Sequence, residues 1–404
     1  MPAGRRKGVV TSAAQSFLKA NVRIPQRVFD AKRDFGAKAD GTSDDTAALQ
    51  KTIDAAAAVR NSIAYLPTGR YAITRALRIT GRDYFVGGSG WATKLLWKGA
   101  EGGTMVEVRA PQHVVLENMD IGTHDGGAMN NAMDIQQTGS AVPSHMTYDG
   151  VYAFGMYQKQ PTRKGFWFIN LGGNDFVVMP HVQGNMHFIN SAAATILANC
   201  SYEGSITVEG KDQARTGFLG FGTRLATGVT HGLYLRDNHS IVMSDFYMEG
   251  SDNGYFFDGT ADLPAGRATI QGAKFHSFAS DDPTKHNVFD IRNYKGEIFL
   301  GPDQFYTDPK LMRMKQEGDA PVTLFLLGCS WYDAKLDAHF GPSAKLLMIG
   351  NEAYGTGPTP APDTVLYTER ATVPTLLSVS HALDDLRRLG EVDMKLNHTA
   401  PTTN

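Results

Sequence analysis

Short apolar segments recur along the chain at nearly regular intervals. The segment at 166–170 returns twenty residues later at 186–190, and a third follows at 205–208 after almost the same interval. Later segments lie at 241–243, 269–271, 297–299, 323–325 and 346–348, with steps of 28, 28, 26 and 23 residues. Periods of this length, with Gly, Asn and Asp between the segments, predict an all-β solenoid. In such a parallel β-helix each coil buries its inner face against the next.

The alignment of the later segments predicts columns of residues along the solenoid. Each segment leads to an aromatic residue that we expect in an internal stack: Phe246, Phe275, Phe305, Trp331 and Tyr354. Strand alternation then places the flanking residues outward. The first outward column reads Asp245, Lys274, Gln304 and Ser330, the second Tyr247, His276, Tyr306 and Tyr332, and the third Glu249, Phe278, Asp308 and Ala334.

These outward columns would form one continuous patch, because neighbouring coils lie only about 4.8 Å apart. Aromatic faces suit sugar rings, and carboxylates and amides suit sugar hydroxyls. The patch therefore favours a polysaccharide partner. The alternative is an ordinary solvated sheet face, on which Asp245 and Lys274 form a surface ion pair of little energetic value.

A short helix is predicted near the N-terminus. Ser43 is a suitable N-cap, Asp44 and Asp45 would place negative charge in the first turn, and apolar residues recur at helical spacing in 49–56. An apolar strand follows and ends in the turn signal Pro-Thr-Gly at 67–69, before a second strand.

This region resembles the opening segment of the pectate-lyase-like superfamily, which includes polygalacturonase-related hydrolases, polysaccharide lyases and phage tailspike depolymerases. The resemblance covers residues 28–97 closely and is carried by DFGAKADGTSDDTAALQ at 34–50, YLPTGRYAI at 65–73 and FVGGSGWATKL at 85–95. It implies a single-stranded right-handed parallel β-helix with an N-terminal capping helix. It also implies a glycan substrate and an extracellular or periplasmic location.

Hydrolysis of a glycosidic bond needs two carboxylates. By the alignment, Glu249 and Asp308 lie two coils, or about 10 Å, apart, at the upper limit for an inverting enzyme. The run HGLYLRD at 231–237 could bring Asp237 to the same face. The candidate catalytic residues are Glu249, Asp308, Asp237, Asp245 and His276, and the candidate substrate-binding residues are Tyr247, Lys274, Gln304, Tyr306, Tyr332 and Arg236. We predict a secreted glycoside hydrolase.

Two alternatives stay open. β-Elimination from a uronic-acid polymer needs a base, an acid and a positive group, and Lys274, His276 and Tyr306 could fill these roles. A non-catalytic glycan-binding or tailspike-like protein would use the same face without cleavage. The motifs of polygalacturonases occur only as fragments, in the His-Gly pair at 231–232 and the Asp pair at 281–282. The resemblance therefore does not imply that this protein acts on pectin.

Composition narrows the function classes. The 404 residues include 43 Gly and 18 Pro with 20% charged residues, as expected for a turn-rich β protein. A formal net charge of −2 gives no basic footprint for nucleic acid, and the sequence has no apolar run long enough for a membrane span.

Cysteine and histidine spacing bears on redox state and metals. Cys200 and Cys329 are far apart in sequence, so we expect buried thiols and no disulfide. The histidines show no zinc spacing, and we predict no metal and no cofactor. The sequence leaves calcium open, because oxygen ligands in loops leave little trace.

Three regions are predicted. Residues 1–27 form an N-terminal extension, 28–354 the parallel β-helix with its cap, and 355–404 a linker and a C-terminal segment. The stretch at 355–362 is rich in Gly and Pro, and 381–389 has apolar residues at helical spacing. This segment would either cap the C-terminal end of the coil or join subunits in a homotrimer.

Overall fold

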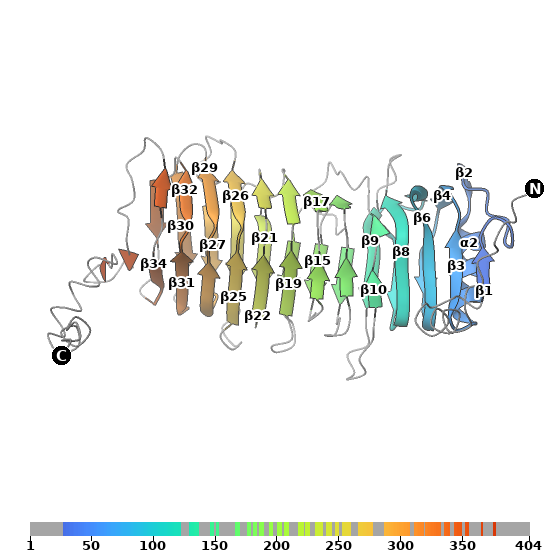
Figure 1. Ribbon diagram of the computed structural model, residues 1–404, viewed down its shortest axis with the longest axis horizontal. Coiled ribbons are helices and arrows are strands. Elements are labelled where there is room, and N and C mark those ends of the chain that lie inside the picture. The colour runs from blue at the N-terminus through green and yellow to red at the C-terminus, as the bar shows by residue number, and fades with distance from the viewer. Residues whose placement is uncertain are drawn as a thin grey trace, which may run out of the picture.

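The chain folds into a long rod of stacked coils (Figure 1). The computed structural model describes residues 27–122 and 129–136 and, between 146 and 376, the strands named below with some of the turns between them. Three parallel sheets, termed sheets A, B and C, form the walls of the rod. The predicted right-handed parallel β-helix is confirmed.

Sheet A has 16 strands. Its main path runs through β1 (Arg27–Asp30), β3 (Ser62–Leu66), β6 (Arg82–Trp97), β8 (Gln112–Gly122), β10 (Met146–Tyr148), β13 (Phe176–Val178), β16 (Ala194–Ile196), β19 (Gly217–Phe221), β22 (Ser240–Ser244), β25 (Gly266–Gln271), β28 (Gly296–Leu300), β31 (Val322–Leu327) and β34 (Lys345–Ile349). Beside this path lie β2 (Asp40–Asp44), β4 (Gly69–Ile73) and β11 (Val151–Tyr152).

Sheets B and C complete each coil. The 11 strands of sheet B are β5 (Leu77–Ile79), β7 (Gly103–Arg109), β9 (Met129–Gln136), β12 (Phe166–Ile169), β15 (Met186–Ile189), β18 (Ile206–Glu209), β21 (His231–Arg236), β24 (Asn253–Asp258), β27 (Asn287–Arg292), β30 (Leu311–Glu317) and β33 (Lys335–His339). The eight strands of sheet C are β14 (His181–Gln183), β17 (Cys200–Glu203), β20 (Thr223–Ala226), β23 (Tyr247–Glu249), β26 (Lys274–Ser277), β29 (Gln304–Thr307), β32 (Ser330–Tyr332) and β35 (Glu352–Tyr354).

The twenty-residue repeat sets the register of the middle coils. In sheet B, β12 pairs residue by residue with β15, and β15 with β18. Phe166, Met186 and Ile206 are opposite one another, as the repeat predicts. The described side chains of Met186 and Ile206 are fully buried, because alternate residues of these strands face the core.

Later coils contain the predicted strands but in a different register. Thr269 lies opposite Val242 and Phe299, so the predicted alignment with Ile241 and Glu297 is wrong. The step between Glu297 and Thr323 is as predicted. The two wrong pairings differ from the predicted ones by one and two residues.

Helix α2 (Thr46–Ala57) packs against the first coils at the N-terminal end (Figure 1). Its buried side chains include Leu49, Ile53 and Ala56, which belong to the core. The predicted N-cap is wrong: the N-cap position is Asp45, whereas Ser43 lies in β2 and donates its amide and hydroxyl to Asp40. The helix is where the prediction placed it, and its role as a cap stays a prediction.

A pair of short strands follows the last coil of the solenoid in sequence. Strands β36 (Val365–Leu366) and β37 (Thr375–Leu376) form a separate antiparallel pair. Residues 1–26 and the segment 381–389 lie outside the described residues. The three-region division therefore stays a prediction, as does the C-terminal cap or trimer contact. Within the described part of the chain, no helix has the length and apolar character to cross a membrane.

A carboxyl group is buried at the corner between sheets A and C. Asp303 is 1% exposed, and its Oδ1 accepts the amide of Ala273 at 2.7 Å. The buried thiol of Cys329 and the buried Tyr255 face the same region. Burial raises the pKa of Asp303 to about 7 and that of Cys329 to about 12. The expectation of a free, buried Cys329 is confirmed, whereas the side chain of Cys200 lies outside the described part.

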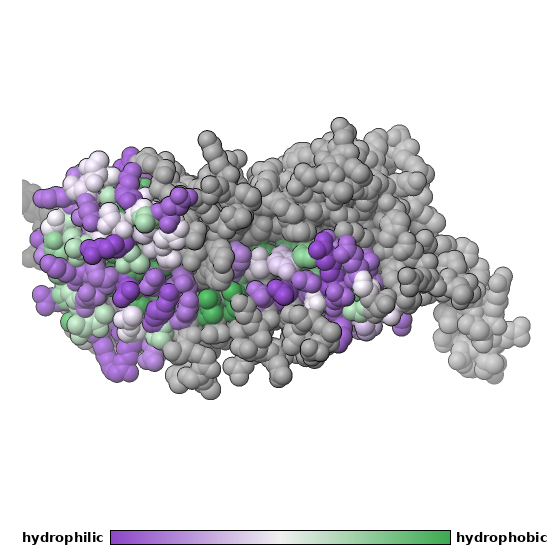
Figure 2. All heavy atoms as spheres, turned by 180° about the vertical axis from the view of Figure 1, so that it is seen from behind, coloured by the Kyte–Doolittle hydropathy of each residue, from purple (hydrophilic) through white to green (hydrophobic). Residues whose placement is uncertain are grey.

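Figure 2 shows the rod from behind. Hydrophilic residues spread over the N-terminal coils, with smaller hydrophobic areas between them. The core lies inside the coils, and its largest fully buried side chains are Tyr71, Tyr84, Tyr255, Tyr294, Phe188 and Phe257.

Core packing gives a first prediction. Leu324 on β31 is fully buried, and Leu324→Ala should lower the free energy of unfolding by about 2–5 kcal/mol through lost apolar contact and a cavity. Leu327 on the same strand is 37% exposed, so Leu327→Ala should cost about 0.5 kcal/mol or less. Urea unfolding of both variants measures the difference. Equal losses would mean that the inner and outer faces of β31 are assigned the wrong way round.

Asp303 gives a second prediction. Its folded pKa of about 7 lies above the ordinary 3.8, so the folded protein binds this proton more tightly than the unfolded chain does. The stabilisation is complete below about pH 4 and is lost as the pH rises through 7, with a total of up to about 4 kcal/mol. Asp303→Asn keeps an acceptor for Ala273 and does not titrate. The melting temperature of the wild type should fall more steeply than that of the variant between about pH 5 and pH 8. Parallel pH profiles would contradict the assignment.

Candidate functional site

The sheet C residues that were predicted to bind glycan lie in two register rows. The rows read Tyr247, Lys274, Gln304 and Ser330, and Glu249, His276, Tyr306 and Tyr332. From β26 onward they agree with the predicted columns. On β23 the prediction is wrong by two positions, because Tyr247 lies opposite Lys274 and Glu249 lies opposite His276.

The predicted column of aromatic residues is shorter in the register of sheet C. Phe275, Phe305 and Trp331 are in register across β26, β29 and β32. Their partners at the two ends are Met248 and Ala353, so the inclusion of Phe246 and Tyr354 is wrong. At the β23 end, the error comes from the same misplaced register of β23 that moved Tyr247 and Glu249.

The predicted catalytic pair loses its alignment. The row of Glu249 continues through His276 to Tyr306, so the column that joined Glu249 to Asp308 is wrong. Asp237, Asp245 and Asp308 lie outside the described residues. The catalytic and binding roles of all the sheet C residues stay predictions.

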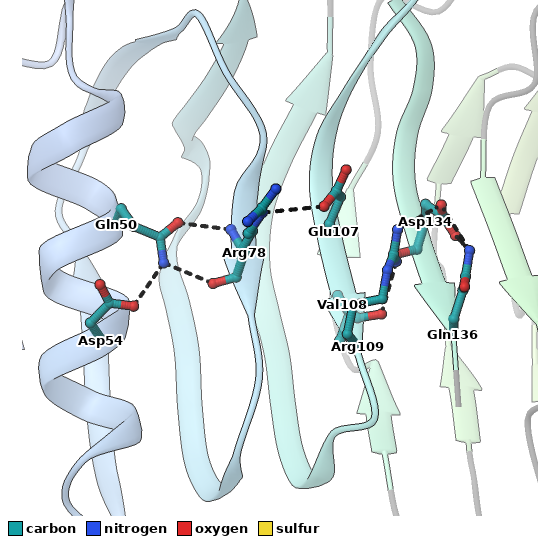
Figure 3. A network of polar contacts seen from close by, with 8 residues as sticks. All are labelled: Gln50, Asp54, Arg78, Glu107, Val108, Arg109, Asp134 and Gln136. Atoms are coloured by element: carbon teal, nitrogen blue, oxygen red, sulfur yellow. Dashed lines mark hydrogen bonds and ion pairs between the residues drawn. The ribbon is translucent and has the colours of Figure 1, made fainter. Parts of the chain in front are cut away.

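A polar row crosses the outer face of sheet B near the N-terminal end (Figure 3). Arg78 on β5, Glu107 on β7 and Asp134 on β9 occupy successive register positions. Their neighbours along the strands, including Val106, Val108 and Met133, are buried. Strand alternation therefore turns the polar row outward.

Two acidic residues in this row face each other directly. Glu107 and Asp134 are register partners on adjacent strands, so their backbones lie about 4.8 Å apart. Like charges in directly opposed positions are destabilising. Their side chains are 27% and 14% exposed, so both reach the surface. The pair is a candidate functional site, because native proteins break local rules of this kind mainly at functional sites.

Cations and an amide hold the pair in place (Figure 3). Arg78 Nε lies 3.5 Å from Glu107 Oε2. Arg109 donates from Nη2 to Asp134 Oδ2 at 3.0 Å and from Nη1 to the Asp134 carbonyl at 2.7 Å. Gln136 Nε2 donates to both carboxylate oxygens of Asp134 at 3.2 Å. Asp134 is thus fixed by several donors, whereas Glu107 contacts one exposed arginine.

Arg236, a predicted binding residue, belongs to a second polar cluster on sheet B. We term its register row the charged row: Glu209, Arg236, Asp258, Arg292 and Glu317. Each contact joins opposite charges, and the N–O distances are 3.6, 3.7 and 3.5 Å for Arg236–Glu209, Arg236–Asp258 and Arg292–Glu317. Each charge in the charged row therefore has neighbours of the opposite sign, whereas Glu107 and Asp134 are neighbours of the same sign.

Aromatic rings accompany the charged row. Tyr234 and Phe256 stack with ring centroids 4.8 Å apart, and the Arg292 guanidinium lies 4.8 Å from the Phe256 centroid. The Tyr234 hydroxyl donates to Asp258 Oδ2 at 3.0 Å, and burial together with this bond raises the pKa of Tyr234 to about 12. Arg292 also donates to the buried Asp290 at 3.1 Å. Burial acts to lower the pKa of Arg292, but Asp290, Glu317 and Asp258 raise it overall.

Sequence reasoning missed Glu107, Asp134 and most of the charged row. A signal was present, because each acid stands between two apolar strand residues, as in VEV at 106–108 and MDI at 133–135. The described residues contain no group of three or more His, Cys, Asp or Glu side chains that could hold a metal ion.

Comparisons with known proteins agree with the N-terminal resemblance. A family model described as "Rhamnogalacturonase A/epimerase, pectate lyase-like" matches residues 29–136. The match includes the segments that carry the resemblance to the pectate-lyase-like superfamily, so this resemblance of the N-terminal region is confirmed.

Two curated relatives match short segments. Mannuronan C5-epimerase AlgE3 of Azotobacter vinelandii is 47% identical over 62 residues, which are 14% of this chain and 3% of that protein. Depolymerase 1, capsule K3-specific, of Klebsiella phage KP32 is 33% identical over 93 residues, 22% of this chain and 11% of that protein. The chain thus spans only a small part of either relative.

Solved structures with a similar course include two carbohydrate-active proteins. The A-module of mannuronan C-5 epimerase AlgE6 of Azotobacter vinelandii has a TM-score of 0.40 and 15% identity, over 81% of this chain and all of that one. The catalytic unit of a GH87 α-1,3-glucanase from Streptomyces thermodiastaticus has a TM-score of 0.42 and 14% identity, over 87% of this chain and 72% of that one.

The charged row gives a third prediction. Arg292→Gln should lower the free energy of unfolding by about 1–3 kcal/mol, because the buried Asp290 loses a charged donor. Arg267→Gln is the matched control on sheet A. Its ion pair with Glu297 joins two exposed side chains and should be worth less than about 1 kcal/mol. Urea unfolding compares the two variants, and equal losses would contradict a buried role for the Arg292–Asp290 contact.

Proposed function

We propose that the protein is a carbohydrate-active enzyme that hydrolyses glycosidic bonds of an extracellular polysaccharide with Glu107 and Asp134. The observation that supports this proposal most is the direct opposition of these two acids on β7 and β9. Retaining glycosidases need two carboxyl groups about 5–5.5 Å apart, and adjacent coils supply backbone positions at about 4.8 Å.

The contacts suggest different roles for the two acids. Asp134 accepts hydrogen bonds from Arg109 and Gln136, which hold its carboxylate in one orientation and suit a nucleophile. Glu107 has the more exposed side chain and forms an ion pair with Arg78, which suits a group that exchanges a proton with the leaving oxygen and then with water. Hydrolysis with retained anomeric configuration follows from these roles.

Similarity to known proteins supports the substrate class. The relatives that match short segments include a mannuronan C5-epimerase and a capsule K3-specific depolymerase. A polysaccharide outside the cytoplasm is therefore the proposed substrate, and an extracellular or periplasmic location is proposed with it. Assembly as a homotrimer stays a prediction.

β-Elimination is the second candidate, and the charged row favours it. Tyr234 donates to Asp258 between Arg236 and Arg292. A tyrosine–carboxylate pair can relay a proton, and flanking guanidinium groups can neutralise a uronate carboxylate. On sheet C, Lys274, His276 and Tyr306 are the predicted residues for the same chemistry.

The fourth prediction tests the acid pair. Glu107→Gln and Asp134→Asn should each abolish release of reducing ends from a panel of neutral and acidic polysaccharides. Removing one of two opposed charges should leave stability unchanged or raise it by about 0.2–1 kcal/mol. Glu297→Gln on sheet A is the control, because it also removes one paired carboxylate and should keep full activity.

Product analysis separates the candidate reactions. Reducing ends without ultraviolet absorbance from unsaturated sugars indicate hydrolysis, and such absorbance indicates β-elimination. Hydrolysis that survives both acid substitutions would contradict the assignment of Glu107 and Asp134. Binding without any product would leave the non-catalytic glycan-binding alternative.

A further inference from the structure

An open groove lies between helix α2 and strand β5, at the start of sheet B. It has a volume of about 720 Å³ and is lined by Thr46, Ala47, Gln50, Lys51, Asp54, Arg75, Ala76, Arg78 and Thr80. Volumes of this size are typical of ligand sites. Arg78 belongs to the groove and also contacts Glu107, so the groove adjoins the acid pair.

Side-chain hydrogen bonds fix the two walls of the groove relative to each other (Figure 3). Gln50 Oε1 on the helix accepts the amide of Arg78 at 2.8 Å, and Gln50 Nε2 donates to the Arg78 carbonyl at 2.9 Å. The same Nε2 donates to Asp54 Oδ1 at 2.8 Å. The groove is therefore formed before a ligand binds, which lowers the entropy cost of binding.

Positive charge dominates the lining. Lys51, Arg75 and Arg78 are exposed, and Asp54 is the carboxylate among the lining residues. Two further acids stand at the edges: Glu107 beside Arg78, and Asp44 near Arg75. Asp44 is engaged by Thr46 and Thr74, whose hydroxyls donate to it at 2.5 and 2.8 Å. Within the lining itself, three cations therefore stand beside one carboxylate, and the two other acids lie at its edges.

We infer that this groove is a binding subsite for an acidic sugar residue, one that carries a carboxylate or a sulfate group. Guanidinium groups bind such planar or tetrahedral anions through paired hydrogen bonds, and Lys51 adds a point charge. Thr80, which is exposed, supplies a hydroxyl for the sugar ring. This inference rests on the proposed function in one respect: the same glycan chain would run from the groove to Glu107 and Asp134.

The register supports that direction. The row that contains Arg78, Glu107 and Asp134 continues strand by strand along sheet B to Tyr234. Six strand spacings of about 4.8 Å separate Arg78 from Tyr234, or about 29 Å in all. A polymer bound along this row would place its end in the groove. A single sugar would reach either the groove or the acid pair, but not both.

The fifth prediction tests the groove by isothermal titration calorimetry on the full chain. The background is Glu107→Gln, so that the ligand is not cleaved. The probes are an oligogalacturonate hexamer, the neutral hexamer maltohexaose, and sodium sulfate. We expect the acidic hexamer to bind, maltohexaose to bind at least tenfold more weakly, and added salt to weaken the acidic hexamer, as screening requires.

Charge variants locate the site. Arg75→Gln with Arg78→Gln should weaken the acidic hexamer at least tenfold with an unchanged melting temperature, because both side chains are exposed. Arg267→Gln with Lys345→Gln removes the same charge from sheet A and should leave the affinity unchanged. Equal weakening by the two double variants, equal binding of both hexamers, or no binding of the acidic hexamer would overturn the inference. Sulfate that binds as tightly as the hexamer would also overturn it, since the site would then hold a free ion and no sugar.

These experiments test the binding subsite and the hydrolase activity independently of each other. Loss of cleavage in Glu107→Gln with intact hexamer binding supports both proposals. Hexamer binding in the groove together with a wild-type protein that cleaves nothing would reject the hydrolase and keep the subsite.

Discussion

Parallel hydrogen bonding between successive coils is the constraint on which the rest of the structure depends. Each strand pairs residue by residue with the strand one coil later, so a residue's inward or outward position is repeated along the rod. The inward column of Ala268, Ile298, Leu324 and Leu346 is fully buried throughout, and the column two residues further along these strands is buried as well. No coil could bury these residues alone, because its inner face is closed only by the next coil.

The same constraint determines what polar residues can do. On the outer face, a charge meets whatever stands at the same position one coil later, about 4.8 Å away. In the charged row this neighbour always has the opposite sign, from Glu209 to Glu317. Such exposed pairs contribute little stability individually. Inside the rod a charge is costly for another reason: burial away from water raises the pKa of Asp303, at the corner between sheets A and C, to about 7.

The sequence predicts strands well and register poorly, for a physical reason. Alternation of apolar residues shows which segments are strands, and the repeat at 166–170 and 186–190 even has its pairing right. In later coils the pairing depends on how many residues each turn uses, and turn length leaves no periodic trace. Tyr247 and Glu249 therefore shifted by two positions. At the helix, Asp-rich sequence favoured Ser43 as the N-cap, but Ser43 instead bonds to Asp40 within β2.

The candidate site could not be predicted for the same reason, because it depends on the register between strands. Arg236 was recognisable from its own sequence, whereas its partners Asp258 and Arg292 become neighbours only through the register of sheet B. Glu107 and Asp134 are too far apart in sequence to belong to one local motif. Each of them alone looks like an ordinary surface acid on a strand. What distinguishes them is their opposition, a like-charged contact that folding would avoid and that Arg78, Arg109 and Gln136 hold in place. In the charged row every neighbour has the opposite sign, so the structure of the solenoid gives little reason for two opposed acids elsewhere on sheet B. A reaction that needs two carboxylates gives such a reason.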